Sequence, residues 1–123
     1  MALRNQPYLP LYVQDFLTDE KLRECSAEAI GVYTMIMCVL HKQENYGKIL
    51  LKQKYKQSDK QIENFAYCFA KHLPFSLSII CKALSELIDE NVLSLDGDFL
   101  IQKRMVKDNE ISEIRAIAGK NGV

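Results

Sequence analysis

An almost uninterrupted apolar segment, residues 29–40, constrains the fold of this chain more than any other feature of its sequence. The segment reads AIGVYTMIMCVL, and only Gly31 and Thr34 interrupt it. Its 12 residues fall well short of the roughly 20 that a membrane-spanning helix requires. A helix with apolar side chains on nearly every side must be covered from more than one direction. The sequence therefore predicts a buried central helix over residues 27–43, with Ser26 as its N-cap.

Two further helices are predicted after the central one. Ser58 and Gln61 have the spacing of a capping box, which predicts the start of a second helix that runs towards Pro74. Ser76 can cap a third helix, whose apolar residues recur at helical spacing. Between the central and second helices, the sequence KILL at residues 48–51 predicts a short strand.

The last third of the chain predicts a β-hairpin followed by a helix. Two runs rich in β-forming residues flank Asp96-Gly97, a pair suited to the positive φ angles of a type I′ turn. The charged segment that begins at Lys103 predicts a largely exposed helix, with Met105, Ile111 and Ile114 facing inward and residues 119–123 frayed.

The predicted order of elements is helix, short strand, helix, helix, β-hairpin, helix. This order is the winged helix-turn-helix arrangement, in which the second and third helices form the helix-turn-helix and the hairpin is the wing. We therefore expect a mainly α fold with a small β-sheet, forming one domain over residues 1–123. Residues 103–123 would be its exit helix and the start of a linker.

The N-terminal residues 1–25 are predicted to form a lid over the central helix. This segment is rich in large apolar side chains that can pack on that helix: Tyr8, Leu9, Leu11, Tyr12 and Phe16. A docking surface for a second protomer is the alternative interpretation of the same residues.

Charge is balanced overall but unevenly distributed. The chain has 16 basic and 16 acidic side chains, so it lacks the basic excess of many nucleic-acid-binding proteins. Six lysines nevertheless fall between residues 42 and 60, whereas residues 86–98 contain five acids and no base. Separated patches of opposite charge can steer a polyanion onto one face of a neutral protein.

Candidate DNA-contacting residues follow from the winged-helix arrangement. Such proteins read base edges with the first turns of the third helix, where we expect an exposed polar face that also includes Ser85 and Glu86. Basic residues before the second helix and after the hairpin can contact phosphates. The candidates are Lys52, Lys54, Lys56, Lys60, Ser76, Ser78, Lys82, Lys103 and Arg104. Alternatively, the basic residues among them are ordinary solvated side chains.

Two Cys–His pairs have spacings that could suit a metal or catalytic site. Cys38 with His41, and Cys68 with His72, have helical spacings that could present four zinc ligands. Cys68 could also act as a nucleophile with His72 as its general base. Structural zinc sites mostly use cysteine pairs on tight turns, and no further catalytic motif accompanies these residues. We therefore expect buried reduced thiols, no disulfide, no metal, no cofactor and no enzymatic activity.

The N-terminal sequence also bears on location. Its first ten residues, MALRNQPYLP, lack the apolar region of a secretory signal. We expect a cytoplasmic protein that does not associate with a membrane.

The segment PLYVQDFLTDEKLRECSAEAIGVYTMIMCVLHK, residues 10–42, resembles the N-terminal domain of phage and prophage replication-initiation proteins, also called replisome organisers. The matching positions are Pro10, Tyr12, Val13, Asp15, Phe16, Leu17, Leu22, Ser26, Glu28, Gly31 and Tyr33. The tail QKRMVKDNEISEIRAIAGKNG is similar to the charged exit helix of that family, which leads to a linker and a second domain.

The resemblance implies a DNA-binding or assembly module related to DnaD-type initiation proteins. Its partners would be double-stranded DNA of an origin region, and a helicase or helicase loader contacted through a C-terminal part beyond this sequence. Two hypotheses remain open at this point. The chain is a DNA-binding winged helix, or it is a protein-interaction winged helix that forms homo-oligomers and scaffolds replisome assembly without contacting DNA.

Overall fold

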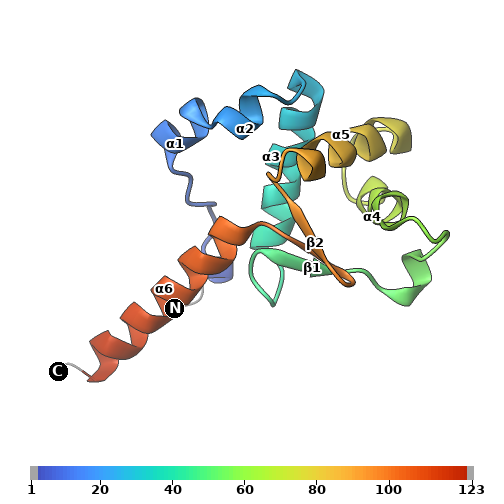
Figure 1. Cartoon of the computed structure of the whole chain (residues 1–123). Coiled ribbons are helices and arrows are strands. Elements are labelled where there is room, and N and C mark those ends of the chain that lie inside the picture. Colours follow the sequence, from blue (N-terminus) through green and yellow to red (C-terminus); the bar gives the residue numbers. More distant parts are fainter. Residues whose placement is uncertain (1–2, 122–123) are drawn as a thin grey trace.

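A computed structural model describes residues 3–121 and has a mainly helical fold with a small antiparallel sheet (Figure 1). The order of elements agrees with the winged-helix prediction. The elements are η1 (Leu3–Asn5), α1 (Val13–Thr18), α2 (Glu20–Arg23), α3 (Ala27–His41), β1 (Lys48–Leu50), η2 (Gln53–Tyr55), α4 (Gln61–Ala70), α5 (Leu77–Asp89), β2 (Ser94–Asp96), β3 (Phe99–Ile101) and α6 (Lys103–Asn121).

Helix α3 is the centre of the core, as the apolar segment predicts. The Ser26 hydroxyl accepts a hydrogen bond from the Ala29 N–H and so caps the helix. Seven of its 15 residues are buried, α5 packs against α3, and α4 packs against α5. One narrow face remains open to solvent and carries Gly31, Thr34, Met35 and Cys38.

Helix α4 does not begin with the predicted capping box. The helix starts at Gln61, and the Ser58 hydroxyl accepts from the Lys60 N–H instead of capping the helix. The Gln61 side chain reaches forward to the hairpin, where it donates to the Gly97 carbonyl and the Asp98 carboxylate. Tertiary contacts with the hairpin therefore replace the local bond that the spacing suggested.

The hairpin forms, but its turn lies one residue later than predicted. Asp96 pairs with Phe99, so the two loop residues are Gly97 and Asp98. Among the described residues, only Asn91, Gly47 and Gly97 have positive φ, and Asp96 therefore cannot occupy a type I′ position. Positive φ at the first loop residue alone is the pattern of a type II′ turn, for which glycine is suited. Strand β3 lies between β1 and β2, which completes the three-stranded sheet.

The lid residues divide into packed and exposed members. Phe16 of α1 stacks on Tyr33 of α3, with ring centroids 6.4 Å apart, and Leu9 is partly buried against the core. Tyr8, Leu11 and Tyr12 are exposed, so the expectation that they pack on the central helix is wrong.

A buried histidine ties the start of the chain to the end of α3. His41 Nε2 lies 3.0 Å from the Gln6 carbonyl, and His41 Nδ1 lies 2.7 Å from the Tyr46 hydroxyl. Because a carbonyl can only accept, Nε2 carries the proton and Nδ1 accepts from Tyr46. Both polar atoms of the buried ring are therefore satisfied.

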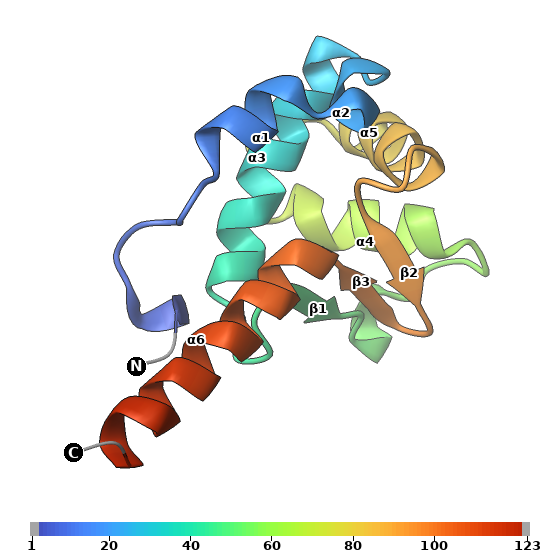
Figure 2. The same cartoon turned by 60° about the vertical axis from the view of Figure 1, so that its left-hand side comes forward.

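Helix α6 leaves the body of the protein after its first turns (Figure 2). Met105 is buried, but Ile111 and Ile114 are exposed, so the prediction that they face inward is wrong. The helix continues through Gly119 to Asn121 instead of fraying, and residues 122–123 lie outside the described part. Gly47, with φ +82°, permits the close approach of α6, since a Cβ there would lie 2.8 Å from the Val106 nitrogen.

Candidate nucleic-acid interface

The first turn of α5 presents a polar surface. The Ser76 hydroxyl accepts from the Ile79 N–H, which makes Ser76 the N-cap as predicted, and it lies 3.2 Å from the Ser78 hydroxyl. Ser76 and Ser78 are exposed, and Lys82 is exposed one turn later. These three candidates therefore lie on the accessible face of the second helix of the helix-turn-helix.

Glu86 does not belong to that exposed face, contrary to the sequence prediction. Its carboxylate accepts from the Ser26 hydroxyl at 2.8 Å and from the Ser26 N–H at 3.0 Å. These bonds hold the pKa of Glu86 below its usual value, with the hydroxyl contribution the largest. Glu86 and Ser85 are only half-exposed. The acid fastens α5 to the start of α3.

Lys52 and Lys54 are exposed on the segment that leads into α4. The Leu51 N–H donates to the Asp98 carbonyl at 2.7 Å, which fixes this segment beside the hairpin turn. Burial raises the pKa of the Cys68 thiol on α4, and the positive charges of Lys52 and Lys54 act in the opposite direction. The two lysines thus lie close enough to α4 for their charges to act on the Cys68 thiol.

Two lysines and two tyrosines meet where this segment faces α4. Lys54 Nζ lies 5.1 Å from the centroid of the Tyr55 ring, and Lys71 Nζ lies 5.1 Å from that of Tyr67. The two rings are 6.3 Å apart and tilted by 59°. We call Lys54, Tyr55, Tyr67 and Lys71 the basic-aromatic cluster; together they line an open pocket of about 200 Å³. Tyr67 also lines the neighbouring groove that contains Ser78, so the cluster adjoins the first turn of α5.

Sequence reasoning missed Tyr67 and Lys71. Their i, i+4 spacing on a predicted helix is a signal for an aromatic ring beneath a cation.

The loop before α4 is held by a buried amide. Asn64 Oδ1 accepts from the N–H groups of Gln57 and Ser58, and Asn64 Nδ2 donates to the Ser58 carbonyl. The Asn64 side chain is buried, and it satisfies backbone groups that the irregular loop leaves unpaired. Lys60 is exposed, and its Nζ atom lies 3.9 Å from Glu63 Oε1, which is near the upper distance limit for an ion pair.

Lys56 forms an ion pair with Asp98 of the hairpin turn. Its ammonium group donates to the Asp98 carboxylate at 2.7 Å, and its side chain is 29% exposed. The pKa of Asp98 is lowered, first by this hydrogen bond and then by the one from Gln61. Lys56 is thus less available to a phosphate than Lys52 or Lys54.

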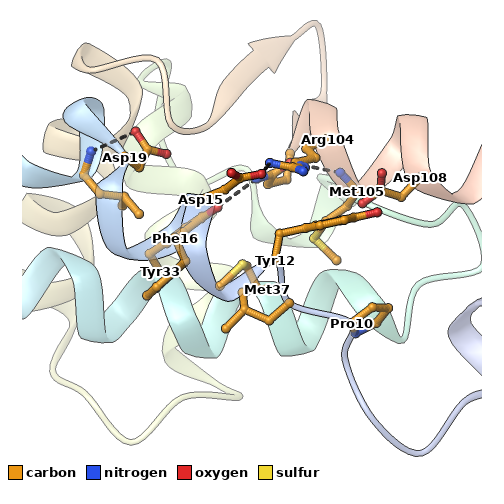
Figure 3. Close-up of a pocket in the computed structure, with 13 residues that line it drawn as sticks. Pro10, Tyr12, Asp15, Phe16, Asp19, Tyr33, Met37, Arg104, Met105 and Asp108 are labelled. Atoms are coloured by element: carbon orange, nitrogen blue, oxygen red, sulfur yellow. Dashed lines mark hydrogen bonds and ion pairs between the residues drawn. The ribbon is translucent and has the colours of Figure 1, made fainter.

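Lys103 and Arg104 lie at the opposite, open end of the hairpin, beside the lid. Arg104 Nη1 is 2.7 Å from Asp15 Oδ2, and its guanidinium carbon is 3.9 Å from the centroid of the Tyr12 ring (Figure 3). Asp15 is the main cause of the raised pKa of Arg104. The structure therefore does not bring Lys103 and Arg104 together with Lys52 and Lys54.

In each Cys–His pair considered as zinc ligands, one residue is buried and the other is exposed. Cys38 is exposed while His41 is buried, and Cys68 is buried while His72 is exposed. Within residues 3–121 there is no group of three or more metal-binding side chains close enough to hold an ion. A buried thiol with a raised pKa is also a poor nucleophile at neutral pH.

The comparisons with known proteins give no family assignment: no family model, curated protein or solved structure matches this chain significantly. Over the described part of the chain, no helix has the length and apolar character needed to cross a membrane.

Proposed function

We propose that this chain is the duplex-DNA-binding winged-helix module of a phage or prophage replication-initiation protein. The observation that carries the proposal is the common location of three features. The first turn of α5 is polar and exposed, it adjoins the basic-aromatic cluster through Tyr67, and Lys52 and Lys54 flank α4 without an ion pair among the described residues. The resemblance of residues 10–42 supports the setting of replication initiation.

In this proposal α5 enters the major groove with its first turn. Ser76 and Ser78 are short hydrogen-bonding side chains at the helix start, and Lys82 is placed to reach a base edge. Lys52, Lys54 and Lys60 contact phosphates, which supply affinity but no sequence reading. Lys56 and Arg104 are left out because each already holds a carboxylate at 2.7 Å.

A titration of a fluorescent 20-base-pair duplex at several salt concentrations tests the proposal. Each neutralised phosphate contributes about 0.9 to the slope of log affinity against log salt, so three or four lysine contacts predict a slope near −3 to −4. A Lys82→Gln variant should in addition change the ranking of duplexes of different sequence. Absence of duplex binding at low salt would contradict the proposal.

The second candidate is a protein-interaction module, and the exposed apolar residues favour it. Ile114 and Ile117 on the projecting part of α6 are 65% and 60% exposed, and Val13 and Leu17 on α1 are 62% and 65% exposed. Side chains of this kind are frequent at protein interfaces. The concentration dependence of the mass by light scattering tests it. A mass that doubles with concentration, together with no duplex binding, would favour a scaffold role.

A further inference from the structure

The basic-aromatic cluster has a composition that duplex binding does not require. Two of its four residues are tyrosines, and Tyr67 is exposed although an apolar ring gains from burial. Phosphate contact needs only the lysines. A ligand that uses the whole cluster must offer both negative charge and a flat π surface.

The surroundings of the cluster exclude a cationic ligand. Lys54 and Lys71 each lie over a ring at 5.1 Å, so the places where an aromatic cage would hold a cation are already taken. Among the ion pairs of the described residues, none includes Lys52, Lys54 or Lys71. The one acid of α4, Glu63, lies one turn before Tyr67, and Lys60 at 3.9 Å opposes its charge. The local field is therefore positive.

We propose that the basic-aromatic cluster binds single-stranded nucleic acid, with one base stacked on Tyr67 and the flanking phosphates on Lys54 and Lys71. Bases in a duplex stack on one another and hide their faces, whereas a single strand presents them. On binding, the base replaces the Lys71 ammonium group above the Tyr67 ring, and the lysine turns to the adjacent phosphate. Base stacking on an aromatic side chain exceeds an exposed cation–π contact in strength, so this exchange is favourable.

This inference goes beyond the proposed duplex function and uses different deciding residues. Tyr67 and Lys71 contribute nothing to the proposed groove contacts, and Lys82 contributes nothing to the strand site. Lys54 is a phosphate contact in both proposals, so it does not distinguish them. A module with both sites would hold a duplex and an adjacent unpaired strand on neighbouring surfaces, because Tyr67 lines both the cluster and the groove beside Ser78.

The test is a binding titration with a fluorescein-labelled dT 12-mer at 50 mM salt. A 12-mer with the same phosphates but no bases measures the contribution of stacking, and an rU 12-mer distinguishes RNA from DNA as the source of the strand. Since the chain has six tyrosines and no tryptophan, quenching of its tyrosine emission by the dT 12-mer gives a second readout.

Matched variants locate the site. Tyr67→Leu removes the stacking ring and should weaken dT 12-mer binding about tenfold, whereas Tyr67→Phe keeps the ring and should stay within about twofold. Tyr8→Leu, the same change at a 63% exposed tyrosine outside the cluster, should have no effect. Lys71→Gln should flatten the salt slope by about 0.7, the value for one phosphate of a single strand. Circular dichroism of each variant checks its fold.

The expected result is preference for the dT or rU 12-mer over the base-free strand, lost in Tyr67→Leu and restored in Tyr67→Phe. Equal binding of the base-free strand would overturn the proposal, as would equal effects of Tyr67→Leu and Tyr8→Leu or the absence of single-strand binding. Duplex binding without single-strand binding overturns this inference alone. Single-strand binding without duplex binding overturns the proposed duplex function alone.

Discussion

Two groups of basic residues in this protein differ in what already neutralises them. Lys52, Lys54 and Lys71 belong to no ion pair of the described residues, and two of them rest on tyrosine rings. Lys56 and Arg104 each hold a carboxylate at 2.7 Å. DNA must displace that carboxylate before it can use the second group, whereas the first group can exchange counterions for phosphates directly. The position of acidic neighbours, more than the number of lysines, decides which surface can meet a polyanion.

The largest effect is expected from the free group. A Lys52→Gln/Lys54→Gln double variant should flatten the salt slope for duplex binding by about 1.8 and weaken binding about 60-fold at 0.1 M salt. Titration of the labelled duplex measures both quantities. A Lys107→Gln/Arg115→Gln variant on exposed α6 has the same net charge and serves as control. Equal losses in the two variants would mean that net charge alone governs binding.

Arg104 of the second group pairs with Asp15 of the lid, which Phe16 anchors on α3. Phe16→Ala should lower the free energy of unfolding by about 2 kcal/mol, less than the 3–5 kcal/mol of a fully buried phenylalanine, because the ring is half-exposed. Urea denaturation measures this difference. A change below about 0.5 kcal/mol, the range of surface substitutions, would show that the lid is not packed on α3 in solution.

Arg104→Gln should lower stability less than Phe16→Ala and should have little effect on duplex affinity. The variant loses a partly exposed ion pair with Asp15 and the stacking on Tyr12, which together contribute about 1 kcal/mol. Duplex affinity should stay within about twofold, because the guanidinium is already occupied. A slope that flattens by about 0.9 would place Arg104 at a phosphate and remove the distinction between the two groups.

The smallest expected effect is a change in one pKa. The hydrogen bond from Lys56 lowers the pKa of Asp98 in the folded state, so the stabilisation it gives is present above the unfolded value of about 3.9. It is lost as the pH falls through the lower folded pKa. Lys56→Gln should raise the pKa of Asp98 towards its ordinary value, which carboxyl NMR titration can follow. An unchanged pKa would mean that Lys56 is unpaired and free for phosphate.

Local patterns were sufficient for α3, α5 and the presence of the hairpin, but the short helices α1 and α2 of the lid were not predicted. Ser26 and Ser76 cap helices as predicted, since each N-cap bond depends only on residues three positions apart. The apolar segment of α3 likewise identified the core. The errors arose where distant contacts compete with local ones. Gln61 bonds the hairpin instead of closing a capping box, and Glu86 bonds Ser26, which is 60 residues away.

The candidate surface was less predictable than the fold. Lys52 and Lys56 are similar in sequence context, and only the tertiary position of Asp98 separates the exposed lysine from the paired one. Ile111 and Ile114 have helical spacing that suggests burial, yet α6 extends beyond the body that would cover them. Which charges and apolar residues remain free depends on how the finished elements are arranged, and spacing along the chain does not contain that information.

The most direct test of the account is an ¹⁵N-labelled protein titrated with a duplex and observed residue by residue in solution by NMR. If α5 and the free lysines contact DNA, the amide signals of residues 52–55 and 76–82 should shift together and saturate with one affinity. The signals of α1 and α6 should stay in place. Shifts confined to α1 and α6, or no shifts at 50 mM salt, would contradict the proposed interface.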